Sequence, residues 1–473
     1  MPTSEDLALM AHLLRRTGFG ANRDQLEAYS ARGYDATLEE LLHPEQQPPF
    51  DDDLAYRYVP YYRMGTSIDS YQSFWIYKMI STNRPLEEKM TLFWHHVFAT
   101  SYSKLQRNPQ MGKQYQMLQS RALGSFRTLL IELARDPAMI FWLDNCENHK
   151  GRPNENFGRE LLELFSLGVG MDGQPNYTED DVKECARAFT GWTMATQLPR
   201  YPYGDYVWDF EYRPDDHDDG EKVFLGQRGR FNGEDIIDII VRQPATARFL
   251  ARHLYNYFVA DEPQVPAWQT TPPQDPQAVK TLEEEYFRSN YDIRSVLRVL
   301  FRSDFFKNAR FKKVKSPAEL VAGVMRLVDD YTSPKPFSHE ISAAASYMGQ
   351  DLLNPPTVEG WHTGKEWIDS GALVERVNFA SSKIGDISKP GVRRMIQRLE
   401  ALGPAMGVPQ LVDACLDLVG PLEVSPARRE ELIAYAQKEG EVRCGTEEEK
   451  REFERRAAAL LQLVVASREF QFA

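Results

Sequence analysis

The sequence predicts a mainly α-helical protein: one large multi-helix domain with a long loop that is rich in aromatic and acidic residues. Apolar residues recur at helical spacing in nearly every segment whose period can be recognised. Residues that typically begin helices precede several of these segments. Two long stretches break the helical pattern, and they mark the loops.

The predicted helices share a face of apolar side chains spaced three or four residues apart. Asp136-Pro137 marks one helix start, because aspartate caps a helix and proline suits its first turn. Thr178-Glu179-Asp180-Asp181 marks another, since acidic residues complement the positive end of the helix dipole. The segments with the clearest helical period are residues 86–98, 125–134, 156–167, 180–189, 245–258 and 293–301.

The main break in the helical pattern covers about residues 194–232, which are rich in tyrosine, proline, glycine and aspartate. A loop of this length inside a compact domain is usually functional or has some secondary structure of its own. We expect it to form a lid or wall that carries two short strands, a β-hairpin. Residues 261–275 form a second, proline-rich break that we expect to be a surface connection.

The sequence also suggests a division into two parts. Residues 391–473 form charged amphipathic helices and are a candidate C-terminal helical subdomain. Residues 1–390 would then make up the main helical domain, with the loop as an insertion. The C-terminal helices either stand apart or pack back onto the main body, and a chain of 473 residues is compatible with both.

Composition argues against some classes of partner. The chain has 69 acidic residues against 56 basic ones, a net charge of −13, which opposes attraction to a phosphate backbone. We therefore expect no nucleic acid partner. The four cysteines include no close pair and predict free thiols.

The N-terminal segment informs the expected location. Residues 1–14 lack the basic start and the unbroken apolar run of a signal peptide. No run approaches the roughly 18 apolar residues that a transmembrane helix needs. The sequence as written therefore predicts a cytoplasmic protein without a transmembrane segment.

Polar residues gather around the helix that begins near Asn156. Glu160 and Glu163 lie with Asn156 along one edge of this helix, beside its apolar stripe. Two carboxylates beside a core suit either metal binding or acid–base chemistry. In the alternative, structural interpretation, Arg159 neutralises these acids and Asn154 caps the helix. The approach to the helix adds Asp144, Asn145 and Glu155, which would orient reacting groups or contact a substrate.

Three further sites carry candidate residues. His95 follows aromatic residues on the helix at 86–98 and is either a ligand or base, or a hydrogen-bonded core residue. His217 and Asp218 end the long loop, where they would provide a base at a cleft mouth or simply form a turn. Trp361 would stack on a sugar ring or pack in the core.

The segment from Asp144 to Gly168 resembles the signature of a large bacterial family known only by its domain of unknown function, numbered eighteen-hundred. Further segments of the chain resemble this family in order, over most of residues 10–380. They include Arg15-Arg16-Thr17-Gly18-Phe19-Gly20, Phe93-Trp94-His95, Lys315-Ser316-Pro317-Ala318-Glu319-Leu320 and Pro355-Pro356-Thr357-Val358-Glu359-Gly360-Trp361. The resemblance implies a helical fold, frequent export of relatives and a sulfatase-like companion protein, and it implies no activity.

These residues leave three functional hypotheses. The first is a metal-dependent enzyme, hydrolytic or oxidative, in which His95, Glu160, Glu163 and His217 hold a divalent metal beneath the loop and Asp218 assists. It requires the four ligands to lie within about 10 Å of one another. The second is a non-catalytic protein that binds a glycan or assembles with the sulfatase-like companion. The third is a glycoside hydrolase that uses carboxylates alone.

Overall fold

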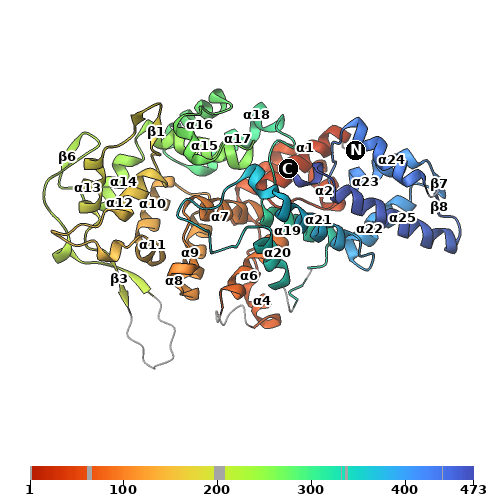
Figure 1. Ribbon diagram of the computed structural model, residues 1–473, viewed down its shortest axis with the longest axis horizontal. Helices are drawn as coiled ribbons and strands as arrows, with labels where there is room; N and C mark the ends of the chain where they lie inside the picture. The colour runs from red at the N-terminus through yellow and green to blue at the C-terminus, as the bar shows by residue number, and fades with distance from the viewer. Residues whose placement is uncertain are drawn as a thin grey trace.

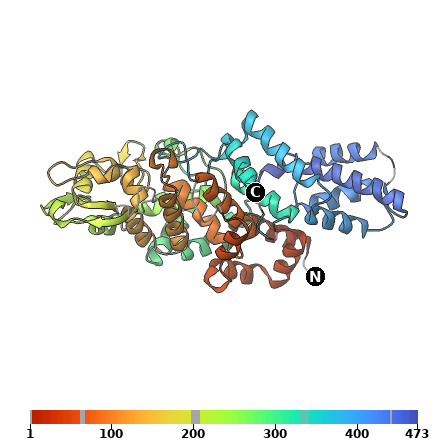
Figure 2. The same cartoon turned by 90° about the horizontal axis from the view of Figure 1, so that it is seen from below.

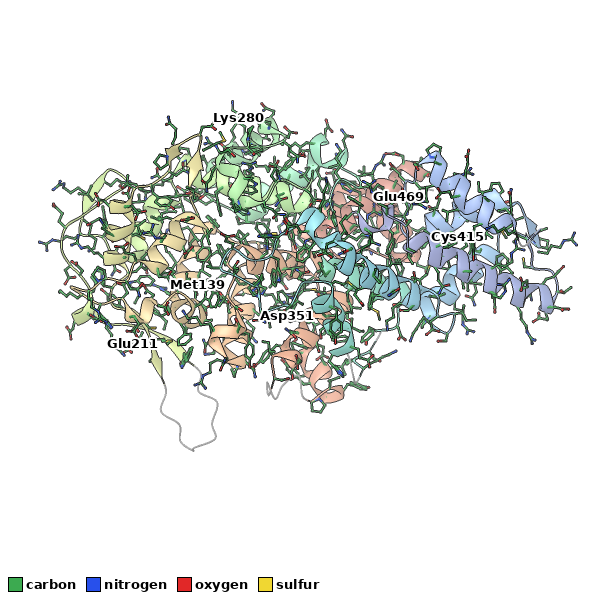
Figure 3. All side chains as sticks on the ribbon, in the orientation of Figure 1. Met139, Glu211, Lys280, Asp351, Cys415 and Glu469 are labelled. Atoms are coloured by element: carbon green, nitrogen blue, oxygen red, sulfur yellow. The ribbon has the colours of Figure 1, made fainter. Side chains whose placement is uncertain are left out.

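The computed structural model describes residues 3–60, 67–196, 208–331, 333–335, 339–438, 440 and 442–473. It confirms the mainly helical prediction: helices run along the whole of an elongated molecule (Figure 1). Among the described residues, strands occur only in two-stranded antiparallel sheets, most of which are hairpins. Side chains fill the spaces between the helices along its length (Figure 3).

The N-terminal helices form the middle of the molecule. Thr3 and Asp6 form a capping box at the start of α1, and Asn22 and Gln25 form another at the start of α2. The elements are α1 (Ser4–Thr17), α2 (Arg23–Arg32), α3 (Tyr34–Leu42), η1 (Pro44–Gln46), α4 (Asp52–Tyr58), α6 (Ile68–Ser81), α7 (Pro85–Val97), α8 (Tyr102–Leu105) and α9 (Asn108–Arg121).

One end of the molecule combines short helices with three of the hairpins. Both predicted helix starts are confirmed, since Asp136 caps α11 and Thr178 forms a capping box with Asp181 at α13. The elements are α10 (Phe126–Arg135), α11 (Pro137–Trp142), η2 (Asn145–Glu147), α12 (Asn156–Glu163), β1 (Gly170–Met171), β2 (Gln174–Pro175), α13 (Glu179–Ala188), β3 (Trp192–Thr196), β4 (Trp208–Tyr212), η3 (Pro214–Asp216), β5 (Lys222–Phe224), β6 (Gln227–Gly229) and α14 (Gly233–Ile240).

The predicted long loop carries a hairpin, as expected. Strands β3 and β4 pair from Trp192 opposite Tyr212 to Thr196 opposite Trp208. A second hairpin, β5–β6, follows within the same segment. Residues 197–207, which include most of the tyrosines behind the lid prediction, lie outside the described residues.

The chain then returns along the molecule through four helices and the proline-rich connection. The predicted surface connection at residues 261–275 contains a short 3-10 helix, η4, whose Trp268 packs against the His253 ring at 4.7 Å between centroids. The elements are α15 (Pro244–Phe258), η4 (Val265–Gln269), α16 (Pro276–Arg288), α17 (Ile293–Arg302) and α18 (Asp304–Lys307).

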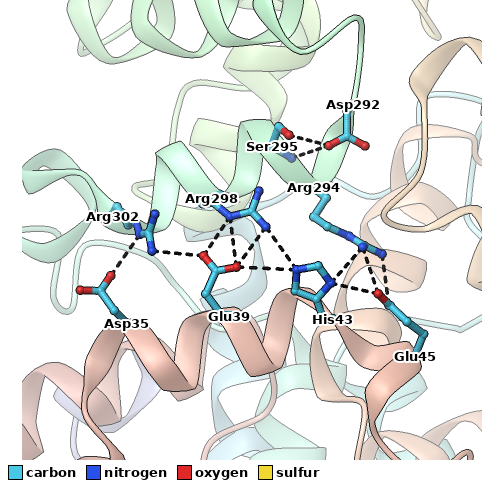
Figure 4. Close-up of polar contacts among 9 residues, drawn as sticks. All are labelled: Asp35, Glu39, His43, Glu45, Asp292, Arg294, Ser295, Arg298 and Arg302. Carbon is cyan, nitrogen blue, oxygen red and sulfur yellow. Dashed lines mark hydrogen bonds and ion pairs between the residues drawn. The ribbon is translucent and has the colours of Figure 1, made fainter.

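A row of ion pairs joins α17 to α3 (Figure 4). The Arg298 guanidinium donates to Glu39 at 2.9 Å and the Arg302 guanidinium to Asp35 at 3.0 Å. Arg294 pairs with Glu45 at 3.0 Å, just beyond the end of α3. The arginines are four residues apart, so all three lie on one face of α17.

The last part of the chain runs from the middle of the molecule to its opposite end, which the helices after residue 390 occupy (Figures 1 and 2). Cys415 lies buried among them (Figure 3), and it is a free thiol, as are the other three cysteines. The elements are α19 (Pro317–Val328), α20 (His339–Tyr347), η5 (Gly364–Ile368), α21 (Ser370–Ile384), α22 (Pro390–Glu400), β7 (Ala405–Met406), α23 (Val408–Leu418), α24 (Pro426–Gln437), β8 (Val442–Arg443), α25 (Glu447–Val465) and η6 (Glu469–Gln471).

These helices share a hydrophobic core with the main body. One continuous cluster of buried side chains includes Phe19 and Trp75 near the N-terminus, Val321 of α19, and Leu461 of α25. The chain end also returns to the body, where Phe472 forms a β-bridge with Val314. A boundary near residue 390 stays a prediction.

The contact between α22 and α19 is tight enough to test. A Cβ added at Gly391 would lie well inside van der Waals contact of the Leu327 carbonyl oxygen and the Val328 backbone. We expect Gly391→Ala to lower the free energy of unfolding by about 1–3 kcal/mol, because the backbones must move apart. Chemical denaturation measures this change.

Gly371→Ala is the matched control. It lies near the start of α21, where the nearest atom to an added Cβ is 3.8 Å away. We expect it to be neutral or to stabilise by about 0.4–1 kcal/mol. Equal effects of the two substitutions would contradict the tight contact.

Candidate functional site

A cleft of about 370 Å³ lies between the end of α12, the β1–β2 hairpin, α15, η4 and α16. We call it the α12–α15 cleft. Its wall is mostly apolar and includes Leu164, Phe249, Trp268 and several prolines. Three carboxylates from distant segments also line it: Glu163, Glu283 and Glu359. Mostly apolar concave surfaces with a few polar groups are typical of small-molecule sites.

A smaller cavity of about 30 Å³ adjoins the cleft, because Leu164 and Glu359 line both. His96, His253 and Trp361 contribute rings to its lining. Trp361 thus lines the cavity next to the cleft, and its role at a site stays a prediction. Imidazole and indole side chains thus lie directly behind the carboxylates of the cleft.

Helix α12 places its two glutamates through local packing. The side-chain oxygen of Asn154 accepts a hydrogen bond from the Asn156 N–H at 3.0 Å, which supports the predicted capping role. Phe157 and Leu161 are buried against the core. At Gly158 a Cβ would lie 3.1 Å from the Ala186 nitrogen, so α13 packs directly against this face. On the opposite edge Glu163 lines the cleft, whereas Glu160, almost one turn earlier, is not among its lining residues.

The electrostatic environment of Glu160 is unusual. Partial burial, together with the nearby charges of Glu163 and Glu359, raises its pKa to about 7, and Arg159 only partly opposes this. The carboxyl group of Glu160 is therefore partly protonated at neutral pH. A carboxylic acid with such a pKa is suited to proton transfer.

Arg159 acts electrostatically on Glu160, as the structural interpretation expects, but it forms no ion pair with Glu160 or Glu163. Its guanidinium instead donates two hydrogen bonds of 2.8 Å to Glu179 and one of 3.3 Å to Glu155. Within the described residues, no ion pair reaches Glu160, Glu163 or Glu359. The Glu163 carboxylate accepts a hydrogen bond from the Tyr177 hydroxyl at 3.1 Å.

Two histidines near the cleft were missed by the sequence analysis. The His253 ring packs between Phe249 and Trp268, and burial lowers its pKa to about 3. Its Nε2 atom is buried without a hydrogen-bond partner among the described residues. His96 stacks on Trp361, and desolvation lowers the pKa of His96 to about 4. The sequence holds only one local indication of His253, namely a histidine within an otherwise largely apolar helix.

His95 is buried in the core, and its surroundings argue against a role as a metal ligand or a base. Its Nε2 atom accepts a hydrogen bond from the Leu353 N–H at 3.0 Å, so that lone pair is already used. The Trp75 and Trp361 rings enclose it at 5.4 and 5.3 Å between centroids. Burial lowers the pKa of His95 to about 3, which fits a neutral, hydrogen-bonded core residue.

His217 and Asp218 fix the fold around α13. The His217 Nδ1–H donates to the Thr190 carbonyl at 2.9 Å. Asp218 pairs with the Arg187 guanidinium at 2.8 Å, which holds its pKa down to about 2. Neither residue lines the α12–α15 cleft, nor does any described residue of the predicted loop.

The polar residues that approach α12 are mostly engaged in structural hydrogen bonds. The Asn145 amide donates to the Trp192 carbonyl and the Asn148 amide to the Ala186 carbonyl, both at 2.8 Å. Asp144 pairs with Lys104 at 2.7 Å. These bonds connect the chain before α12 to α13 and β3, so this segment holds the helix in place.

The described residues give the predicted metal site no support. Among them, no group of three or more histidine, cysteine, aspartate or glutamate side chains lies close enough together to hold a metal ion. The cationic side chains of the cleft are also paired, Arg248 with Glu283 at 3.3 Å and Arg252 with Glu262 at 2.8 Å. The unpaired groups beside the cleft are therefore acidic.

Comparison with known proteins identifies a family without an activity. A family model described as "Protein of unknown function (DUF1800)" matches residues 12–472. No curated protein and no solved structure matches the chain. None of the described helices combines the length and the apolar character needed to cross a membrane.

The raised pKa of Glu160 predicts a pH-dependent stability. The folded protein keeps a proton on Glu160 up to about pH 7, whereas the unfolded chain releases it near pH 4.5, the usual pKa of a glutamate. Its burial therefore destabilises the fold increasingly as pH rises from 4.5 to 7. We expect Glu160→Gln to stabilise the protein at pH 8 by about 1 kcal/mol, after allowance for solvent screening, and to have little effect at pH 4.5.

Thermal denaturation of both proteins across this pH range measures the difference. Glu147→Gln is the control, because Glu147 is exposed. A Glu160→Gln effect that does not change with pH would show that the pKa of Glu160 is not raised by folding.

Proposed function

We propose that this chain, which belongs to the DUF1800 family, is a hydrolytic enzyme that cleaves a glycosidic bond in the α12–α15 cleft. One observation carries the proposal: Glu160 has a raised pKa and no paired cation among the described residues, and it lies near Glu163 and Glu359, two carboxylates that line a cleft with an aromatic wall. General acid catalysis of glycoside cleavage needs a carboxylic acid that is still protonated near neutral pH.

The three glutamates have different roles in this proposal. Glu160 donates its proton to the leaving-group oxygen as the bond from that oxygen to the sugar carbon breaks. Glu359, on a separate segment, accepts a proton from the water that attacks this carbon. Glu163, held by Tyr177, supplies the negative charge that helps to keep Glu160 protonated. The products are an alcohol and a free sugar. The enzyme returns to its starting state when Glu359 has lost its proton and Glu160 has regained one.

The lining of the cleft restricts the substrate. Its apolar side contains Phe249 and Trp268, and aromatic rings pack well against the carbon faces of sugars. Its unpaired charged groups, Glu163 and Glu359, would repel an anionic sugar. We therefore infer an uncharged or amino-substituted glycan as the substrate.

A second candidate function is glycan binding without catalysis. It is favoured by the segment before α12, because the side chains there form hydrogen bonds with the protein's own backbone. These side chains are Asn145, Asn148 and Asn154. Under this alternative the raised pKa of Glu160 would be a by-product of burial. The same cleft would then bind the sugar without breaking it.

Hydrolysis of uncharged nitrophenyl glycosides and of unlabelled oligosaccharides tests the proposal. We expect Glu160→Gln and Glu359→Gln each to lower kcat/KM by about 10²–10⁴-fold, and Glu147→Gln to leave it unchanged. Wild-type activity should fall on the alkaline side of about pH 7 as Glu160 loses its proton.

The alternatives give different results. Saturable oligosaccharide binding without turnover, weakened by Trp268→Ala, would favour the binding protein. Activity that chelator dialysis abolishes and one divalent metal restores would favour the metal-dependent enzyme. Turnover that survives in Glu160→Gln would contradict the assigned roles.

A further inference from the structure

A second cavity, of about 40 Å³, lies where α1, α2 and α19 meet the last residues of the chain. We call it the basic cavity. It shares no lining residue with the α12–α15 cleft. Leu26, Leu320 and Val324 form its apolar side, while Arg15, Lys315 and Glu319 contribute charged groups. The basic residues belong to two segments that the proposed hydrolysis does not use.

The surroundings of this cavity have an excess of positive charge. Six basic side chains interact electrostatically here with two acidic ones, Asp261 and Glu319. The six are Arg15, Arg16, Lys89, Lys313, Lys315 and Arg376. A third acid, Glu423, also acts on Arg15, but it is paired with a further basic residue, Arg310, at 3.1 Å. Such an excess inside a protein is unfavourable unless counter-charges are present.

The two acids already have partners. Glu319 forms a buried ion pair with Lys89, and Asp261 pairs with Lys313 at 3.1 Å. The remaining four basic groups donate to neutral oxygens: Arg15 to the Gly420 carbonyl, Arg16 to the Val259 carbonyl, Lys315 to the Phe470 carbonyl, and Arg376 to the Lys315 carbonyl and the Gln471 side chain.

Several N–H groups of these arginines have no partner. In the described part of the chain, Nε and Nη2 of Arg15, Nε of Arg16 and Nη1 of Arg376 are buried without a hydrogen-bond acceptor. Arg16 and Arg376 are 2% and 0% exposed, so bulk water does not satisfy them. Buried donors without acceptors are rare, and they commonly indicate an unseen water or ion.

We propose that the basic cavity binds one small anion, an oxyanion such as phosphate or sulfate or a carboxylate. The anion would supply the missing acceptors for Arg15 and the missing negative charge beside Lys315. The cavity volume exceeds the roughly 10–15 Å³ that one water molecule requires, so it admits a small ligand.

Two titratable neighbours agree with this charge imbalance. The pKa of Lys315 is held well below its usual value, first by burial and then by the charges of Arg15 and Arg376. Burial, aided by Arg16 and Arg15, lowers the pKa of His12 to about 2. Both shifts show that additional positive charge is disfavoured here.

Anion-dependent stability tests the proposal. The melting temperature of the full chain is measured with increasing phosphate, sulfate or acetate, at constant ionic strength in sodium chloride. We expect a saturable rise of several degrees with at least one of them, because a ligand that binds only the folded state stabilises it. Comparison of the three series distinguishes an oxyanion site from a carboxylate site.

Variants locate the effect. We expect Lys315→Met and Arg15→Met each to lose the rise, whereas Lys312→Met, the same change at an exposed lysine nearby, should keep it. In chloride alone, Lys315→Met should melt at or above the wild-type temperature, since an uncompensated buried charge has been removed.

Equilibrium dialysis of the wild-type protein against labelled phosphate, sulfate or acetate adds a measurement that does not depend on the variants. We expect about one anion per chain. No saturable rise and no bound anion in the wild-type protein would overturn the proposal, and so would an equal rise in wild type, Lys312→Met and Lys315→Met.

Discussion

The buried ion pair of Lys89 and Glu319 joins three separate parts of the chain. Lys89 belongs to α7, and its ammonium also donates to the Gly18 carbonyl at the end of α1. Glu319 lies in the first turn of α19, where its carboxylate accepts the Ser316 N–H at 2.6 Å. Because loss of either partner would leave an unpaired charge in the core, the pair constrains how these helices meet. The basic cavity, which Glu319 lines, and the core shared with the C-terminal helices, which includes α19, both lie at this junction.

Most other buried polar groups have partners, and this makes the exceptions informative. The amides before α12 bond to backbone carbonyls, and His95 accepts a backbone N–H. Two of the exceptions lie at the proposed sites: Glu160 sits beside like charges, and Arg15 keeps unpartnered donors. Stability alone would not select either arrangement, since each has an unfavourable electrostatic free energy. At both places we therefore expect a bound ligand or a catalysed reaction to account for the arrangement.

Local signals in the sequence were sufficient for much of the fold but not for the site. The helix at α13 and its start at Thr178 follow from capping and periodicity, and the β3–β4 hairpin follows from the break in that periodicity. Glu160 and Glu163 were recognised because both lie on one short helix. Glu359 and His253 were not, because only tertiary contacts bring them to the cleft. The pairing of Arg159 with Glu179 was missed for the same reason.

The row of ion pairs between α3 and α17 has a consequence for helix register. Its charges repeat every four residues on α17 and nearly so on α3, with Asp35, Glu39 and His43 facing Arg302, Arg298 and Arg294. A slide by one turn, about 5.4 Å, would still place two arginines opposite acids. The charges thus specify that α3 packs against α17. The register of one helix along the other must be fixed by the buried Leu38, Leu41 and Leu42.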